Sequence, residues 1–167
     1  FHSDGVPGLG KDMFADIIAG TLLGTRDPRN DPYKRYQVLH CKEGKGVGAV
    51  RELLEVVKEG PPNQICGDNA LFILNITEIQ SLSRDALEAL LNIAEHPPAW
   101  FYLLATTTNL EAVRASSTEK NTAKTGGSSP LISRAYCVHL KPIPVHQIDK
   151  RLHFIVNAEG WTVSEEV

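Results

Sequence analysis

The fold of this chain is decided by the stretch Gly5-Val6-Pro7-Gly8-Leu9-Gly10-Lys11-Asp12, which matches the pattern G-x-x-x-x-G-K. Glycines at such positions let backbone N–H groups curl around phosphate oxygens, and the helix that follows adds positive potential at its N-terminus. Lys11 would reach the β- and γ-phosphates of a nucleotide. The stretch predicts a phosphate-binding loop between a strand and a helix. The alternative is a Gly-rich turn without a ligand.

The groups that normally hold Mg²⁺ beside such a loop are replaced in this sequence. Asp12 stands where Ser or Thr usually binds the ion, and its charge would repel phosphate, although a carboxylate is also a metal ligand. The apolar run 71–74 leads to Thr77 and Glu78, at the positions of the usual Asp and Glu. Because both replaced residues would hold the same Mg²⁺ ion, we predict that the hydrolytic site has decayed and that Glu78 is vestigial. ATP and Mg²⁺ stay open as cofactors.

Apolar periodicity along the rest of the chain predicts helices that alternate with strands. We expect loops at 25–35 and at the Ser/Thr/Gly-rich stretch 114–130. Ser83 is the expected N-cap of one helix. The alternation predicts an α/β fold, in which helices cover both faces of a parallel sheet. The predicted helices lie at 14–22, 47–57, 83–95 and 145–159, and the predicted strands at 36–40, 70–74, 100–105 and 135–140.

Both ends of the chain look cut within an element. Phe1 to Ser3 run directly into the Gly-rich loop, where a strand is expected to lead in. Thr162 and Glu165 have the spacing of a capping box, so a helix is expected to begin there. We predict a nucleotide-fold core over residues 1–140, with a truncated first strand, and the beginning of a small helical domain over residues 141–167.

Composition excludes several classes of protein. The chain has 167 residues, three cysteines and a formal net charge of −3, which excludes a generally basic nucleic-acid coat. No apolar run reaches the length of a membrane span, and the widely spaced cysteines predict reduced thiols, so we expect a cytoplasmic protein without a membrane partner. His146 and His153 lie two helical turns apart, too far to share one ion, and no metal site is predicted.

Four further segments carry recognisable motifs: LSRDALEALL at 82–91 followed by AEHPP at 94–98, LLATT at 103–107, LISR at 131–134 and VGAVREL at 47–53. With these motifs, nearly the whole chain resembles the clamp-loader branch of the AAA+ ATPases. It is most similar to the bacterial delta-prime class of DNA polymerase III subunits. The resemblance implies a parallel-sheet P-loop NTPase core of the AAA+/RecA-like type, with a helical lid domain beginning near residue 141.

The resemblance also implies roles for two residues. Thr107 would read the γ-phosphate, and Arg134 would be an arginine finger that acts in trans on a neighbouring subunit's ATP. We expect Arg134 to project from the start of a strand after a flexible loop. From the residues alone, an Arg134 that pairs with a carboxylate or lies in solvent is favoured over the finger role.

The implied function is that of a delta-prime-like clamp-loader subunit that does not hydrolyse ATP itself. Its partners would be the other subunits of a hetero-oligomer, with the sliding clamp and primer–template DNA reached through the complex. The alternatives are an active AAA+ clamp-loader ATPase (gamma/tau-like or small replication-factor-C-like) and an unrelated P-loop kinase. The sequence departs from the family at Glu88, Asn92 and Ala135, and loop 25–35 lacks the four-cysteine zinc module of bacterial relatives.

Overall fold

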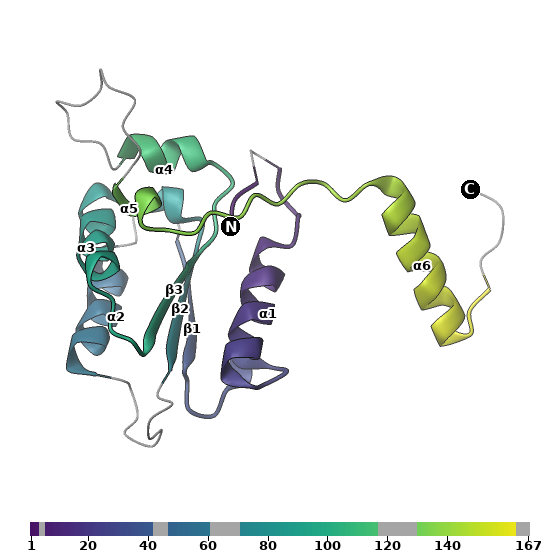
Figure 1. Ribbon diagram of the computed structural model, residues 1–167, viewed down its shortest axis with the longest axis horizontal. Coiled ribbons are helices and arrows are strands. Elements are labelled where there is room, and N and C mark those ends of the chain that lie inside the picture. The colour runs from purple at the N-terminus through teal and green to yellow at the C-terminus, as the bar shows by residue number, and fades with distance from the viewer. Residues whose placement is uncertain (4–5, 42–46, 61–70, 117–129, 163–167) are drawn as a thin grey trace.

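The computed structural model describes residues 1–3, 6–41, 47–60, 71–116 and 130–162. A three-stranded parallel sheet in the order β1-β2-β3 lies between helices (Figure 1). The strands are β1 (Tyr36–His40), β2 (Phe72–Thr77) and β3 (Phe101–Ala105). The helices are α1 (Lys11–Leu23), α2 (Val47–Glu59), α3 (Arg84–Glu95), α4 (Leu110–Ser116), α5 (Pro130–Ser133) and α6 (Val145–Glu159), with 3₁₀ turns η1 (Pro28–Asn30) and η2 (Ile79–Ser81).

Two short extended segments continue the sheet beyond β3. His2 forms parallel bridges to Thr107 on one side and to His139 on the other. The Thr107 N–H donates to the Phe1 carbonyl at 3.0 Å, and the Leu140 N–H donates to the His2 carbonyl at 2.9 Å. Residues 1–3 therefore lie between β3 and residues 138–140. The Gly-rich loop starts from the carboxyl end of this segment.

The strand predicted over residues 135–140 is mostly wrong. The structure has a single bridge there, at His139. The preceding residues are still wound into the end of α5, because the Ala135 N–H donates to the Ile132 carbonyl at 3.1 Å. The predicted loop 114–130 is also too long at both ends, since residue 116 closes α4 and residue 130 opens α5. Residues 117–129 of that loop lie outside the described residues.

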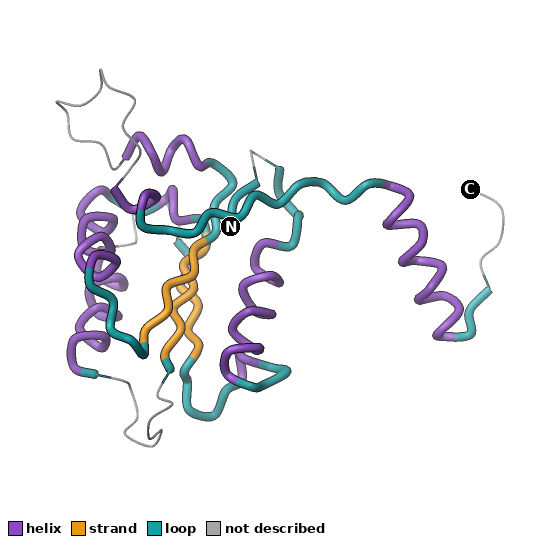
Figure 2. The backbone as a smooth tube through the Cα atoms, in the orientation of Figure 1, coloured by secondary structure: helices purple, strands orange, loops and turns teal. Residues whose placement is uncertain are grey.

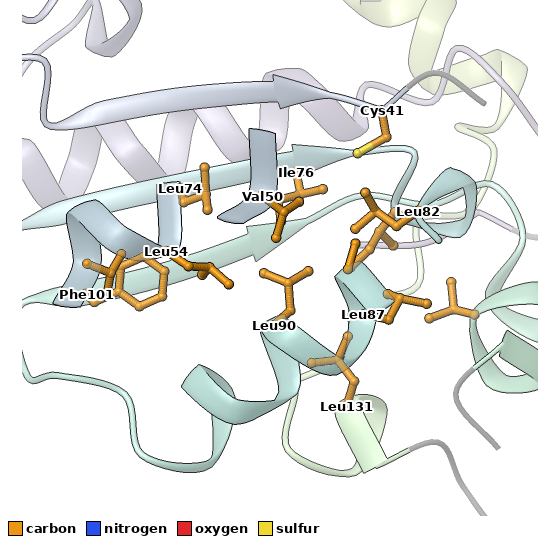
Figure 3. Packing of buried hydrophobic residues seen from close by; sticks show 14 of the residues in the cluster. Cys41, Val50, Leu54, Leu74, Ile76, Leu82, Leu87, Leu90, Phe101 and Leu131 are labelled. Carbon is orange, nitrogen blue, oxygen red and sulfur yellow. The ribbon is translucent and has the colours of Figure 1, made fainter. Parts of the chain in front are cut away.

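Side chains of β2 alternate between the two faces of the sheet, and all six of its residues are buried. Phe72, Leu74 and Ile76 belong to the larger core, which α2 and α3 complete (Figure 3). Ile73 packs on the opposite face with Ala19 of α1. Helices on both faces of a parallel sheet, as predicted, explain why β2 is buried at every position.

The ends of α3 follow from its flanking residues. The Ser83 hydroxyl accepts a hydrogen bond from the Ala86 N–H at 3.3 Å, which confirms the predicted N-cap. The helix ends at Glu95, directly before His96 and the two prolines at 97 and 98, which disfavour further helical backbone. This places Glu95 at the exposed C-terminal end of α3.

One chain of polar side chains links the sheet to α1 and η1. The buried Asn75 amide donates to the Tyr36 hydroxyl at 2.9 Å, and that hydroxyl donates to Asp16 of α1 at 2.8 Å. Arg29 donates to the other Asp16 oxygen, also at 2.8 Å. Burial, together with the bond to Asp16, raises the pKa of Tyr36 well above its ordinary value. Tyr36 is therefore held as a neutral donor between two strands and a helix.

Replacing Tyr36 by phenylalanine is expected to lower the free energy of unfolding by about 1–3 kcal/mol, because the buried Asn75 amide loses its acceptor. Asn75 Oδ1 already lacks a hydrogen-bond partner among the described residues, so its amide would then be unsatisfied on both atoms. Urea unfolding measures the change. Tyr102→Phe, at an exposed tyrosine of β3, is the matched control and should shift stability by less than about 0.5 kcal/mol. Equal effects of the two variants would contradict a structural role for this chain.

The thiol of Cys41, next to the end of β1, makes the stability of the fold depend on pH in the alkaline range. Burial raises the pKa of this thiol to about 11. Because the unfolded chain loses this proton first, stability contributed by the neutral thiol is present below pH 9 and is lost as the pH rises towards 11. We expect a loss of about 1 kcal/mol at pH 10 from this group. Cys41→Ala should remove that part of the pH dependence, whereas Cys137→Ala, at an exposed thiol, should retain it; identical pH profiles of the two variants would refute the assignment.

Helix α6 lies apart from the sheet, at the end of an extended connection (Figure 2). Its predicted limits are confirmed, with Gly160 as the left-handed C-cap. None of its residues is buried. The described residues show no lid domain, and the division at residue 141 stays a prediction. Within the described part of the chain, no helix has the length and apolarity needed to span a membrane.

Candidate phosphate-binding site

The Gly-rich loop joins residues 1–3 to α1, as the motif predicts. Gly8 and Gly10 have φ angles of +76° and +78°, where a side chain would be strained, and Pro7 is exposed. Gly5 lies outside the described residues. Gly10 is the N-cap of α1 and has no side chain that could accept from the first-turn N–H groups. These groups keep their hydrogen-bonding capacity for an anion.

Lys11 points into the base of the loop rather than into solvent. Its ammonium donates to the Ser3 hydroxyl at 2.9 Å, and this hydroxyl donates to the Val6 carbonyl at 2.6 Å. Lys11 is only 8% exposed and Ser3 only 1%. Ser3 therefore ties the lysine to the segment that precedes the loop. Sequence reasoning missed Ser3; its position two residues before the first glycine of the motif was the available signal.

Asp12 lies in the first turn of α1 and is exposed. The hydroxyl of Thr106, which follows β3 and is buried, donates to Asp12 Oδ1 at 3.3 Å. Its carboxylate thus faces the carboxyl end of the sheet, beside the loop. The favourable interaction of a carboxylate with the helix N-terminus explains why this position tolerates a negative charge.

Glu78 belongs to a network at the carboxyl ends of β2 and β3. Its carboxylate accepts from the Thr108 hydroxyl at 3.0 Å and from the Gln80 amide. The Gln80 carbonyl in turn accepts from the Thr107 hydroxyl at 2.5 Å. Glu78 has a φ of +53°, an unfavourable angle for a non-glycine residue that strained functional positions often adopt. Gln80, which sequence reasoning missed, holds Glu78 and Thr107 together.

The structure separates the sequence-predicted ligand residues into two groups. Lys11 and Asp12 lie at the loop, where Asp12 accepts from Thr106. Glu78 and Thr107 belong to the second group, around Gln80. Thr77 turns towards β1, where its hydroxyl lies 3.0 Å from the His40 ring nitrogen Nδ1 and 3.5 Å from the Leu39 carbonyl. The hydroxyl of Thr77 is therefore committed to the neighbouring strand.

Arg134 follows the one-turn helix α5 and does not project from the start of a strand. Its guanidinium donates to Glu95 Oε1 at 2.9 Å and to the Pro130 carbonyl at 2.8 Å. The side chain remains 37% exposed. Among the residues that the structure describes, no hydrogen bond or ion pair joins it to the Gly-rich loop of its own chain. It lies on a surface that a neighbouring molecule can reach.

The loop and its surroundings fit the phosphates of a nucleotide but not its magnesium ion. The buried Lys11 ammonium and the uncapped helix N-terminus offer donors and positive potential to phosphate oxygens. The hydroxyl that would hold Mg²⁺ is replaced by Asp12, and the Asp that would hold the ion at the end of the strand is replaced by Thr77. The described residues also contain no group of three or more side chains arranged to hold a metal ion.

No protein-family model matches the chain, and no curated protein sequence does. A variant of RuvB from Thermotoga maritima has a similar structure, with a TM-score of 0.58 and 19% identity over 95% of this chain and 43% of that one. The Thermotoga maritima RuvB Holliday junction branch migration motor has a TM-score of 0.56 and 20% identity, over 95% of this chain and 43% of that one. A DNA polymerase III gamma subunit-related protein from the same organism has a TM-score of 0.47 and 14% identity, over 71% of this chain and 33% of that one.

The chain thus spans less than half the length of these solved structures. At such identities the similarity concerns the fold alone. The similarity to the RuvB structures extends over 95% of this chain. This chain has the AAA+ ATPase fold.

Proposed function

We propose that this chain is the nucleotide-fold core of a clamp-loader subunit of the delta-prime type. It does not hydrolyse ATP itself, and it supplies Arg134 to the ATP site of a neighbouring subunit in a hetero-oligomer that places a sliding clamp on primer–template DNA. The observation that carries the proposal is the paired loss of magnesium-holding groups, at Asp12 and Thr77, in a chain whose Arg134 is exposed. The motifs at 82–98 and 131–134 support the choice of family.

The surroundings of the two replaced residues support the absence of hydrolysis. A bound Mg²⁺ neutralises the charge that develops as the γ-phosphoryl group leaves. Here the Thr77 hydroxyl is bonded to the neighbouring strand, and Asp12 adds negative charge beside the loop. Glu78 alone cannot replace a metal ion, because it would polarise water without stabilising the phosphoryl group.

The setting of Arg134 supports a role in trans. Exposed ion pairs of this kind are worth about 0–1 kcal/mol, so leaving Glu95 costs little when a phosphate is offered instead. The planar guanidinium can bind two oxygens of that phosphate at once. The short helix α5 holds Arg134 at the surface without burying it.

Purification of the full-length protein with its partners tests the proposal. Clamp-loader ATPase subunits are expected among the partners identified by mass spectrometry. The full-length protein alone should show no ATP hydrolysis above background, whereas the assembled complex should hydrolyse ATP. A protein that hydrolyses ATP alone, or that assembles with no clamp-loader subunit, would contradict the proposal.

Retention of Lys11, Glu78 and Thr107 favours a second candidate, an active AAA+ ATPase subunit of a clamp loader. In that case Asp12 would bind the magnesium ion directly. Hydrolysis by the full-length protein alone, abolished by Lys11→Ala, would support this candidate over the first.

A further inference from the structure

The Gly-rich loop carries a positive charge on Lys11 next to a negative charge on Asp12. Lys11 is buried, and its one hydrogen bond among the described residues goes to Ser3, a neutral hydroxyl. A buried ammonium without a countercharge is unfavourable, so the base of the loop favours an anion. The uncapped N-terminus of α1, a helix of 13 residues, adds to this preference.

Asp12 limits how much negative charge the loop can accept. In nucleotide sites of this kind, the residue after the lysine holds the ion that bridges the second and third phosphates. A carboxylate at this position repels the third phosphate unless a cation separates them. The bond from Thr106 keeps the Asp12 carboxylate at the carboxyl end of the sheet, beside the loop.

We propose that the loop binds a diphosphate group, free or carried by a nucleoside, without a divalent cation, and that Asp12 excludes the third phosphate of a triphosphate. The inference deepens the proposed function and rests on its statement that the chain does not use Mg²⁺ with ATP. Lys11 and the first turn of α1 hold the diphosphate. Asp12 is the specificity-determining residue, and Thr106 positions it.

Isothermal titration calorimetry on the full-length protein tests the inference, with ADP, ATP and inorganic pyrophosphate as probes. ADP is expected to bind at least about tenfold more tightly than ATP, and its affinity should not change when magnesium is replaced by a chelator. Equal binding of ADP and pyrophosphate would assign recognition to the diphosphate group alone. Tighter binding of ADP would assign part of it to the nucleoside, and both results support the inference.

Two variants separate the roles of the two charges. Asp12→Asn keeps the size of the side chain and an acceptor for Thr106, so it should bring the affinities for ADP and ATP to within about twofold. Lys11→Ala should abolish binding of both. Equal affinities in the unchanged protein, binding that requires Mg²⁺, an Asp12→Asn variant with an unaltered preference, or no binding at all would each overturn the inference.

The failure of this inference differs from failure of the proposed function. Absence of ADP binding leaves a non-hydrolysing subunit with a working Arg134 in place, because that role is measured on the partner's ATP. Hydrolysis of ATP with Mg²⁺ by the protein alone would instead overturn the proposed function itself.

Discussion

Replacing Arg134 by alanine is expected to lower ATP turnover at the neighbouring subunit's site by about 10³-fold or more. A guanidinium that approaches the γ-phosphate stabilises the charge that develops during transfer, and no other group on this chain is placed by the motifs to do so. The effect should appear in the rate of turnover rather than in the affinity for ATP. It is measured as single-turnover hydrolysis by the assembled complex, with assembly checked by gel filtration.

The ion pair between Arg134 and Glu95 provides a matched control. Glu95→Gln breaks the same pair but leaves the guanidinium in place, so it should preserve turnover within a few-fold. If both variants lowered turnover equally, Arg134 would be acting through the fold. If Arg134→Ala kept full activity in an assembled complex, the finger role would be refuted.

Replacing Leu90 by alanine is expected to cost about 2–5 kcal/mol of unfolding free energy. Leu90 lies on α3, is fully buried, and points into the core between α3, α2 and the sheet (Figure 3). Truncation leaves a cavity that close-packed neighbours fill only in part. The loss removes a large share of the stability of an ordinary domain.

Leu22→Ala is the matched control for this prediction. It makes the same substitution in helix α1, at a side chain that is 42% exposed, and should change stability by less than about 1 kcal/mol. Urea unfolding followed by circular dichroism compares the two variants. A core assignment for Leu90 would be untenable if the two midpoints moved by the same amount.

Much of the fold could be predicted because it rests on local patterns. The apolar run before Thr77 gave a buried parallel strand, although that strand continues to Thr77 itself. Ser83 caps the start of α3, and the prolines after His96 end the helix; neither effect needs a residue far away in the sequence. Gly160 ends α6 in the same way.

The parts that could not be predicted depend on residues far apart in sequence. Residues 135–140 carry strand-like side chains, yet the bridge there is at His139, and the turn that follows α5 reaches as far as Ala135. Helix α4 is short, and its last residues lie within the predicted loop 114–130. Short helices depend on packing rather than on intrinsic propensity.

The candidate site likewise has a part set by neighbouring residues and a part set by residues far apart in the sequence. Lys11 and Asp12 are adjacent, so a motif identified them together. Ser3 and Thr106 contact these two residues only because the chain returns to the loop, and Thr106 lies 94 residues from Asp12. One-dimensional spacing identifies the charged residues of the loop but not the hydroxyl groups that orient them.

The position of residues 1–3 has a consequence for the order in which the molecule is built. They are synthesised before the rest of this chain, yet the Phe1 nitrogen donates to the Ala105 carbonyl 104 residues away, and His2 bridges to His139 on its other side. Contacts of such large separation form late, because a long loop must close first. The segment that anchors the phosphate loop is therefore synthesised early and fixed late, so nascent chains acquire their β1–β2 pairing before they acquire an anion site.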